Sequence, residues 1–242
     1  MSKLPKITIF FWIMKIFATT LGETAGDAFS MSMNLGYLVS TGIFAVIVIA
    51  AVALQIRAKQ FQPFLYWFTI IATTTVGTTL ADFATRSLGI GYTGGASILL
   101  SMVVGSLLVW RWVMGSVSVD QVNTTMGEIF YWVTIIFSQT LGTALGDWFA
   151  DTAGFGYLGA AVVFGGVLLI VVALYYFTSI SRVILFWIAF IMTRPLGAVV
   201  GDFLDKPLVQ GGLNLSRYTA SLILIAGIVA CIFIFPQKVA QE

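Results

Sequence analysis

The sequence contains no histidine and a single cysteine, Cys231. The lack of histidine excludes zinc sites built on imidazole, histidine general bases and histidine pH switches, and one cysteine cannot form a disulfide within the chain. Charged residues are also scarce, at 9% of the 242 residues, whereas soluble domains carry about 25%. With 59% hydrophobic residues and a mean hydropathy of +1.01, the chain is expected to be an integral membrane protein. Its net charge of +2 gives no indication of a nucleic-acid partner.

The chain contains several long apolar segments with few charged residues. A membrane-spanning helix needs about 20 mostly apolar residues, and eight segments meet that requirement: residues 7–28, 37–56, 64–84, 92–113, 129–150, 157–178, 183–204 and 218–236. Because unpaired strand edges are not tolerated in lipid, we expect an all-α integral membrane protein with eight transmembrane helices. These helices are expected to pair as four hairpins in a single membrane domain that covers residues 1–242.

One pattern occurs four times and defines the repeats. A Trp is followed by a Gly ten residues later and by an Asp five residues after that Gly: Trp12 and Asp27, Trp67 and Asp82, Trp132 and Asp147, Trp187 and Asp202. The repeats cover about residues 7–56, 64–113, 129–178 and 183–236, with a polar linker at 114–128 that suggests duplication of a two-repeat half. We interpret the four Trp residues as interfacial anchors, with a stacking surface for an organic substrate as the alternative.

Each repeat contains two spans, so all four motifs enter the membrane from the same face. The repeats are therefore expected to be parallel, around an axis along the membrane normal. Basic residues indicate the orientation, and those expected on the side of the termini, namely Lys3, Lys6, Arg57, Lys59, Arg111, Arg182 and Lys238, outnumber Arg86, Lys206 and Arg217 on the other. This excess predicts that both termini are cytoplasmic. Lys15, one turn from the inner face, is expected to snorkel to the interface.

Two features of the motif follow helical spacing. Small residues four positions apart let helices approach closely, so the motif helices are expected to pack around a shared axis through Gly22 and Gly26, Gly77 and Ala81, Gly142 and Gly146, and Gly197 and Gly201. Polar residues at i, i+4 and i+8 share one helix face, which in lipid must turn toward protein or water. These polar stripes are Thr19, Glu23 and Asp27; Thr74, Thr78 and Asp82; Gln139, Thr143 and Asp147; and Arg194, Ala198 and Asp202.

The stripes would line a polar path whose outer layer is the four aspartates. Together with Glu23 they gather five acids against one base, Arg194, and like charges in a low-dielectric site cannot all stay ionised. Three outcomes are open: a cation binds among the acids, Arg194 pairs with one of them, or some are protonated. Oxygen ligands without His or Cys favour a hard cation such as Mg²⁺, Ca²⁺ or Mn²⁺. In the alternative interpretation, each Asp only ends its helix and caps the next segment.

Two residues depart from the repeat. Glu23 has no acidic counterpart in the other repeats, which makes it the strongest single candidate for a functional role. Arg194 lies deep in its span and precedes Pro195, which is expected to kink the helix. Arg194 is interpreted either as half of a structural Arg–Asp pair or as a contact to an anion or substrate. The long turn between Asp202 and Tyr218 is expected to be a tolerated insertion.

The four Trp–Gly–Asp units resemble a bacterial family of uncharacterised membrane-anchored proteins. That family is built of four tandem two-helix repeats of unknown function, each with a characteristic Trp. The resemblance covers nearly the whole chain and implies an eight-helix protein of the bacterial inner membrane, without implying an activity. Arg194, Pro195 and the long turn of the fourth repeat depart from the pattern, so strict fourfold equivalence is not expected.

The sequence therefore favours a small membrane transporter or channel for a cation, either a divalent metal ion or one that is proton-coupled. Its central site would be built from Glu23 and the four repeated Asp residues. Two alternatives are a transporter of a small organic solute with Arg194 as counter-charge, and a scaffold or regulatory protein that transports nothing. An intramembrane aspartyl protease is not favoured, because such enzymes use Gly-x-Gly-Asp with a second, unlike Asp motif, whereas this chain repeats one motif and has Ala25-Gly-Asp and Leu145-Gly-Asp. Apart from a hard divalent cation no cofactor is expected; the expected partners are the lipid bilayer and a small ion or solute, with homo-oligomerisation left open.

Overall fold

The computed structural model describes residues 3–119, 122–235, 237 and 239, so Pro236, Lys238 and residues 120–121 of the linker lie outside it. The described chain forms eight α-helices: α1 (Ile9–Asp27), α2 (Gly36–Arg57), α3 (Pro63–Asp82), α4 (Gly91–Met114), α5 (Thr125–Asp147), α6 (Gly156–Phe177), α7 (Arg182–Asp205) and α8 (Arg217–Ile234). The described residues form no strand, only an isolated antiparallel bridge between Pro5 and Val239. The all-α prediction is confirmed.

Seven of these helices, all except α1, are long and apolar enough to cross a membrane. Helix α1 has 19 residues and buries three ionisable side chains, Lys15, Glu23 and Asp27. The expected spans coincide with the helices to within a few residues at their ends.

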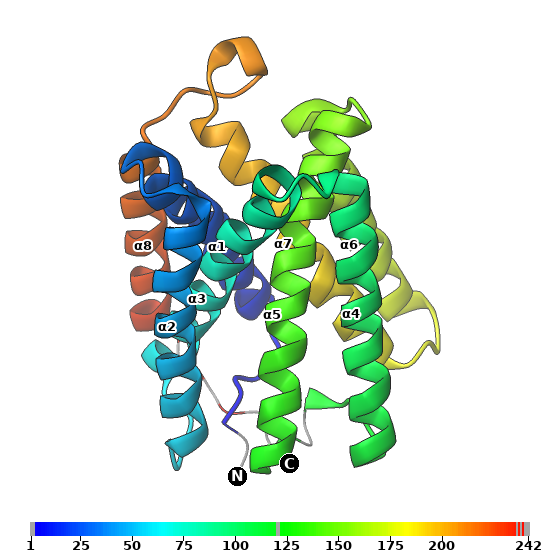
Figure 1. Ribbon diagram of the computed structural model, residues 1–242. Helices are drawn as coiled ribbons and strands as arrows, with labels where there is room; N and C mark the ends of the chain where they lie inside the picture. The colour runs from blue at the N-terminus through cyan, green and yellow to red at the C-terminus, as the bar shows by residue number, and fades with distance from the viewer. Residues whose placement is uncertain (1–2, 120–121, 236, 238, 240–242) are drawn as a thin grey trace.

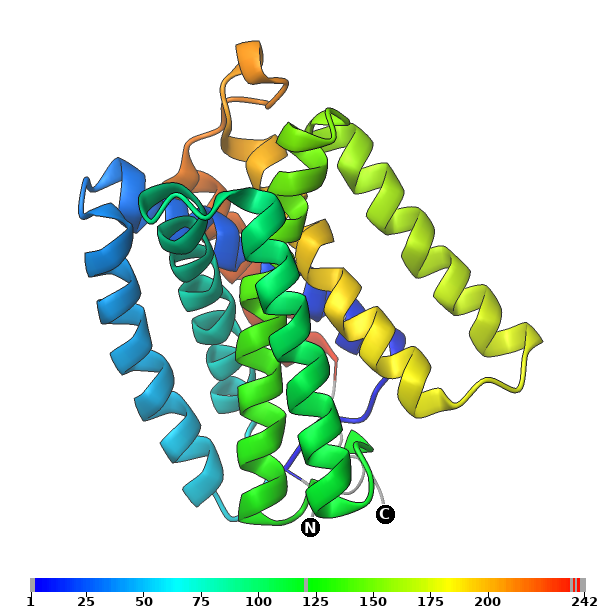
Figure 2. The same cartoon turned by 45° about the vertical axis from the view of Figure 1, so that its right-hand side comes forward.

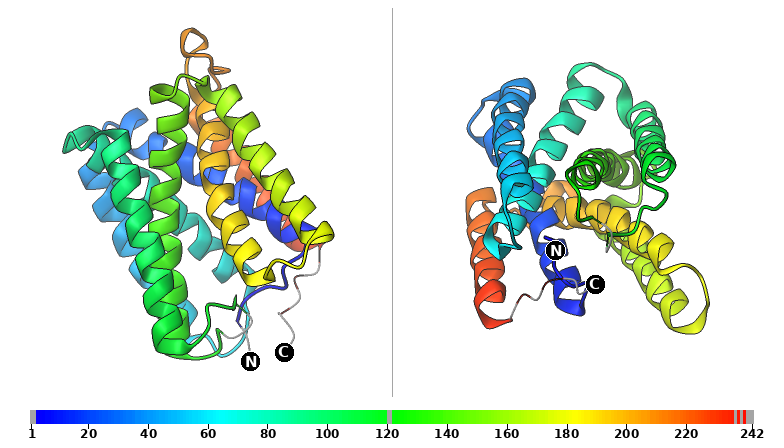
Figure 3. Two further views of the ribbon diagram at one scale, coloured as in Figure 1. Left: turned by 90° about the vertical axis from the view of Figure 1, so that its right-hand side faces the viewer. Right: turned by 90° about the horizontal axis from the view of Figure 1, so that it is seen from below.

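The four motif helices form a closed inner ring. Helix α1 packs on α3, α3 on α5, α5 on α7, and α7 on α1. The remaining helices, α2, α4, α6 and α8, lie around this ring, as the view along the bundle shows (Figure 3, right). Of the most apolar part of α3, 72% is buried, against 22% for α2, so the motif helices are the core and the second helices are the cover.

The two helices of one repeat do not pack as a hairpin, so that prediction is wrong. Each outer helix packs mainly on the inner helix of the next repeat: α2 on α3, α4 on α5, α6 on α7, and α8 on α1. Figure 2 shows α6 lying along α7. In the first three repeats the chain continues past the motif Asp into a π-helical turn, Ala28–Ser32, Phe83–Ser87 or Trp148–Thr152. A glycine with φ of +65° to +73° then starts the outer helix, and this extra length carries the chain across to the neighbouring repeat.

All four inner helices run in the same direction (Figure 1). Their first residues lie at the end of the bundle that also holds the bridge between Pro5 and Val239, which we call the terminal end. Their aspartates lie at the opposite end, which we call the acidic end, where residues 206–216 project between α7 and α8.

Aromatic side chains fill the bundle toward the terminal end. Trp67, Trp132 and Trp187 are 1–4% exposed, and the hydroxyl groups of Tyr66 and Tyr131 form a hydrogen bond of 2.8 Å. The interpretation of these three Trp residues as interfacial anchors is therefore wrong. They belong to one central cluster and pack against other aromatic rings, for example Tyr66 and Tyr131, because the inner helices turn these positions toward the ring rather than outward.

Candidate functional site

Small residues of each inner helix receive the polar stripe of the next. A Cβ atom on any of the first motif glycines would clash with that neighbour: Gly22 with Thr74, Gly77 with Gln139, Gly142 with Arg194, and Gly197 with Thr19. The second glycines repeat this one turn later, where Gly26 meets Thr78, Gly146 meets Ala198, and Gly201 meets Glu23. The small-residue pattern therefore serves the close packing that the sequence predicts.

Hydroxyl groups of the stripe hydrogen-bond across these contacts. Thr74 Oγ1 donates to the carbonyl of Ala18 over 3.2 Å, and Thr19 Oγ1 donates to the carbonyl of Thr193 over 3.2 Å. Backbone and side chain thus meet directly between α1 and α3 and between α7 and α1.

The polar stripes stack in layers of four buried residues. The same four-residue spacing continues past the predicted stripes toward the terminal end. From the terminal end the layers are Phe11, Tyr66, Tyr131 and Phe186; Lys15, Ile70, Ile135 and Phe190; Thr19, Thr74, Gln139 and Arg194; Glu23, Thr78, Thr143 and Ala198; and the four aspartates. The polarity rises toward the acidic end. The three layers nearest the acidic end were predicted from the sequence. The two layers nearest the terminal end were missed, although their residues follow the same four-residue spacing.

The centre of the site is an ion pair contacted by all four inner helices. Arg194 Nη2 on α7 donates to Glu23 Oε2 on α1 over 2.9 Å and to Thr78 Oγ1 on α3 over 2.7 Å. It also donates to Thr143 Oγ1 on α5. Arg194 is 0% exposed and Glu23 is 3% exposed. Of the three outcomes open at the sequence level, the structure has Arg194 paired with an acid, and that acid is Glu23.

Two basic residues bridge the aspartate layer in pairs. Arg86 Nε lies 3.0 Å from Asp82 and Arg86 Nη2 lies 3.2 Å from Asp147. Lys206 Nζ lies 2.7 Å from Asp27 and 2.9 Å from Asp202. The expectation that the acids face one another with Arg194 as their only base is therefore wrong.

Sequence reasoning missed these counter-charges. Arg86 and Lys206 each follow their own Asp by four residues, the spacing at which oppositely charged residues meet on a helix face. The long turn after α7 is also more than an insertion, because it holds Lys206, which is 7% exposed. At its far end, Arg217 pairs with Asp205 and lies 3.7 Å from Asp27.

A group of three carboxylates has the geometry of a cation site. Oxygen atoms of Asp27, Asp202 and Asp205 all lie within 4.8 Å of one another, and the ammonium group of Lys206 contacts two of these residues. Burial alone would lower the pKa of Lys206, but the carboxylates of Asp202, Asp27 and Asp205 hold that pKa above the usual lysine range. A hard divalent cation would therefore have to compete with a protonated lysine at this position.

The interpretation of the repeated Asp residues as helix caps is wrong. Asp27, Asp82 and Asp147 make no side-chain capping hydrogen bond to the turn that follows them. The helix does not end there but widens into the π-helical turn. The carboxylates instead point to basic side chains, where opposite charge compensates for burial.

Lys15 does not snorkel. Its side chain is 0% exposed, and its Nζ lies 4.1 Å from the centre of the Phe190 ring.

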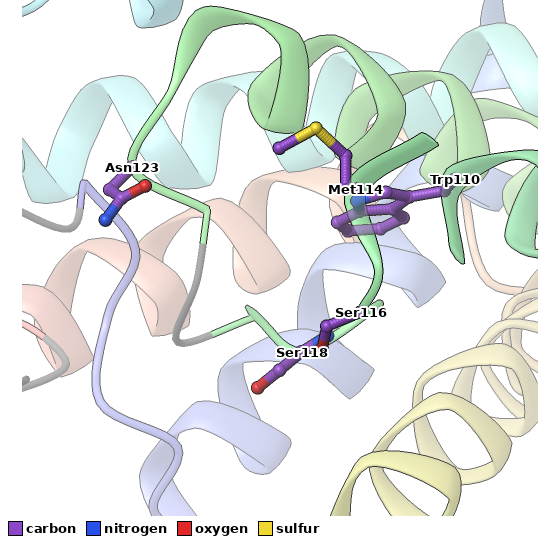
Figure 4. A pocket seen from close by; sticks show the side chains of 5 residues that line it. All are labelled: Trp110, Met114, Ser116, Ser118 and Asn123. Carbon is purple, nitrogen blue, oxygen red and sulfur yellow. The ribbon is translucent and has the colours of Figure 1, made fainter. Parts of the chain in front are cut away.

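A separate cavity of about 290 Å³ lies at the terminal end near the linker, lined by Trp110, Met114, Ser116, Ser118 and Asn123 (Figure 4). None of the stripe residues lines this cavity.

A family model described as Repeat of Unknown Function (DUF347) matches residues 10–61, 65–116, 130–181 and 185–235. The chain belongs to this family. The resemblance inferred from the four tandem repeats is thus confirmed. No curated protein and no solved structure matches the chain. Within the DUF347 repeats of this chain, the first motif glycine and the terminal Asp occur in all four copies, whereas Lys15, Glu23, Gln139 and Arg194 each stand in one repeat only.

Proposed function

We propose that this chain is a small multi-pass transporter of the bacterial inner membrane, with eight spanning helices and a path along the axis of the inner ring. Seven helices have the length and composition to span, and α1 can join them because the ring buries its ionisable side chains. Three basic residues at the acidic end, Arg86, Lys206 and Arg217, are engaged in ion pairs. The basic residues near the terminal end then support cytoplasmic termini.

The observation that carries this proposal is the Glu23–Arg194 pair at the centre of four helices. A buried ion pair loses so much hydration that it is weak support for stability alone, so its presence in one copy of a repeat favours a functional role. Layers on both sides enclose it: the bridged aspartates toward the acidic end and the Tyr66–Tyr131 contact toward the terminal end. This arrangement suits a transporter closed on both sides of its central site.

We propose a cation as the cargo or the coupling ion. A proton or a hard divalent cation that binds Glu23 would compete with Arg194 and release it from the closed layer. The four aspartates would then act as an outer gate, because each must leave its basic partner before the path opens. The oxygen cluster of Asp27, Asp202 and Asp205 supports a transient cation position in that gate.

One observation favours the second candidate, a small solute held by Arg194. The Nε and Nη1 atoms of Arg194 are buried and have no hydrogen-bond partner among the described residues. A solute with an acceptor group would satisfy them. A scaffold without transport remains the competing class, and it predicts that the purified protein moves nothing.

The test is flux in liposomes that contain the purified protein and an internal dye for protons or Mn²⁺. We expect the wild-type protein to transport, and we expect Glu23→Gln and Asp27→Asn to lose at least about tenfold in rate, as losses of single charged groups at functional sites do. Asp151→Asn is the matched control, because Asp151 is an exposed acid at the same end. The double variant Glu23→Gln/Arg194→Gln leaves neither charge unpaired, so it should stay folded and still lose flux, which separates a loss of function from misfolding. Undiminished flux in a folded Glu23→Gln variant would end the proposal.

A further inference from the structure

The fourfold pattern is broken in the middle of the bundle by a buried lysine. The residues that occupy the position of Lys15 in the other repeats are Ile70, Ile135 and Phe190, and all three are 0% exposed. Lys15 is therefore a charged residue in a layer that the repeat otherwise makes apolar. Repeat architecture does not account for it.

No acid among the residues that the structure describes forms an ion pair with the Lys15 ammonium group. Its Nζ has no hydrogen-bond partner among the described residues and lies 4.1 Å from the centre of the Phe190 ring. A cation–π contact stabilises an ammonium only modestly, whereas an unpaired charge in an apolar interior costs far more. Something further must favour keeping lysine here.

Two other buried side chains of the inner ring carry unpartnered N–H groups: Gln139, and Arg194 at its Nε and Nη1 atoms. Phe190, under the Lys15 ammonium, precedes Arg194 by one helical turn on α7, and both amide atoms of Gln139 are unpartnered among the described residues. Gln139 precedes Gly142 by one turn on α5, and Gly142 packs directly on the Arg194 side chain. In the layers of the inner ring, Lys15 lies one step from Gln139 and Arg194 toward the terminal end, so unsatisfied N–H groups of α1, α5 and α7 occupy two adjacent layers.

We propose that these three residues, the Lys–Gln–Arg centre, bind one small monovalent anion. The charge favours this class of ligand, because Lys15 in its protonated form and Arg194 together bring two positive charges against the one negative charge of Glu23. The donors also favour it, since Lys15 Nζ, Gln139 Nε2 and the free atoms of Arg194 can all donate to an anion. The close packing of the surrounding layers limits the ligand to the size of chloride, nitrate or formate.

This inference deepens the proposed transport function and rests on it only for the claim that the anion moves. Binding can be measured without transport. An anion at the Lys–Gln–Arg centre would compensate for Lys15 and leave Glu23 to exchange with Arg194, so a coupled cation and a small anion would occupy adjacent layers of one path.

The experiment is thermal unfolding of the purified protein in detergent, with sodium nitrate, formate or chloride compared with sodium gluconate at equal ionic strength. For the wild type we expect a rise in Tm of about 5 °C at a hundredfold excess over Kd for at least one small anion. Lys15→Ile restores the residue that the repeat places at this position. We expect it to raise the Tm without anion and to weaken anion binding by at least about tenfold.

The controls separate a site from a general salt effect. Lys59→Ile removes a lysine charge at an exposed position and should keep the full anion shift. Gln139→Leu is a second variant at the centre and should also weaken the shift, which covers the case in which Lys15→Ile does not fold. The inference is overturned if the wild type shows no shift specific to small anions, or if the folded Lys15→Ile or Gln139→Leu variant keeps it. Anion binding without any flux would support the site and contradict the transporter, whereas cation flux without an anion shift would contradict the site alone.

Discussion

Gly197 on α7 lies directly against Thr19 on α1, so the last motif helix packs on the first as each earlier one packs on the next. The Thr19 hydroxyl donates to the Thr193 carbonyl across the same contact over 3.2 Å. This contact closes four tandem repeats into a ring. It explains why the first and last repeats of the chain keep the same small-residue pattern as the middle ones.

Substitution of Gly197 by valine is expected to disrupt the packing of α7 on α1 that closes the ring. The added side chain would clash with Thr19, and overpacking of a tight contact costs about 1–3 kcal/mol. We expect Gly197→Val to lower the Tm in detergent or to reduce the yield of folded protein. Gly165→Val is the matched control, because a Cβ at Gly165 on α6 meets nothing within 4 Å. Equal losses for the two variants would contradict the account of the ring.

Removal of either member of the Glu23–Arg194 pair is expected to be costly. Breaking a buried ion pair leaves an uncompensated charge and costs about 3–5 kcal/mol. We expect Glu23→Gln and Arg194→Gln each to destabilise the protein strongly, and the double variant to lose clearly less than the sum. A double-mutant cycle on the free energy of unfolding measures this coupling. Simple additivity would show that the two side chains act independently.

The ion pairs of Lys206 with Asp27 and Asp202 are expected to stabilise the folded protein throughout the physiological pH range. Neighbouring carboxylates hold the pKa of Lys206 above its usual range, so its stabilising effect is fully present below the ordinary lysine pKa and is lost only as the pH rises through the higher folded-state value. We expect Lys206→Met to lower the Tm by the same amount at every pH from about 7 to 9, whereas Lys59→Met should change it little. A difference that fades between pH 7 and pH 9 would mean that Lys206 loses its proton there.

The hydrogen bond between Tyr66 and Tyr131 is expected to add modestly to the free energy of unfolding, and removing either hydroxyl group should lose the same contribution. Tyr66→Phe and Tyr131→Phe should each cost about 0.5–1.5 kcal/mol, and the double variant little more than one of them, because both remove the same 2.8 Å contact. Chemical unfolding monitored by tryptophan fluorescence provides the measurement. Tyr176→Phe serves as control, since Tyr176 is 74% exposed, and a loss there as large as at Tyr66 would count against a specific contact.

Local spacing made much of the fold predictable. Apolar length located the eight helices, and the four-residue spacing of Gly22 and Gly26 and of their counterparts identified the faces that pack. The pairing of outer helices was not predictable in this way. Consecutive helices usually neighbour each other, but α2 follows α1 and precedes α3, so this rule does not decide between the two inner helices. The return of α8 to α1, which joins the two ends of the chain, is seen only in the docked ring.

The acidic residues of the candidate site could be identified from the sequence, whereas most of its basic residues could not. Glu23 stood out because no other repeat has an acid there, and the structure places it in contact with Arg194. Arg86 and Lys206 were counted as loop charges that orient the chain, and the four-residue step back to each Asp was overlooked. Lys15 was assigned to the surface because fully buried lysine is rare, and only the packing of Phe190 beneath its ammonium group corrects that.

The most direct test of the central claim is the initial rate of proton movement into liposomes that contain the purified protein, driven by a defined membrane potential. The account predicts a rate well above that of protein-free liposomes for the wild type, and a rate near that background for the folded Glu23→Gln/Arg194→Gln variant. Repetition with a Mn²⁺ gradient covers a divalent cargo. Background rates for the wild type with both ions, or equal rates for wild type and double variant, would contradict it.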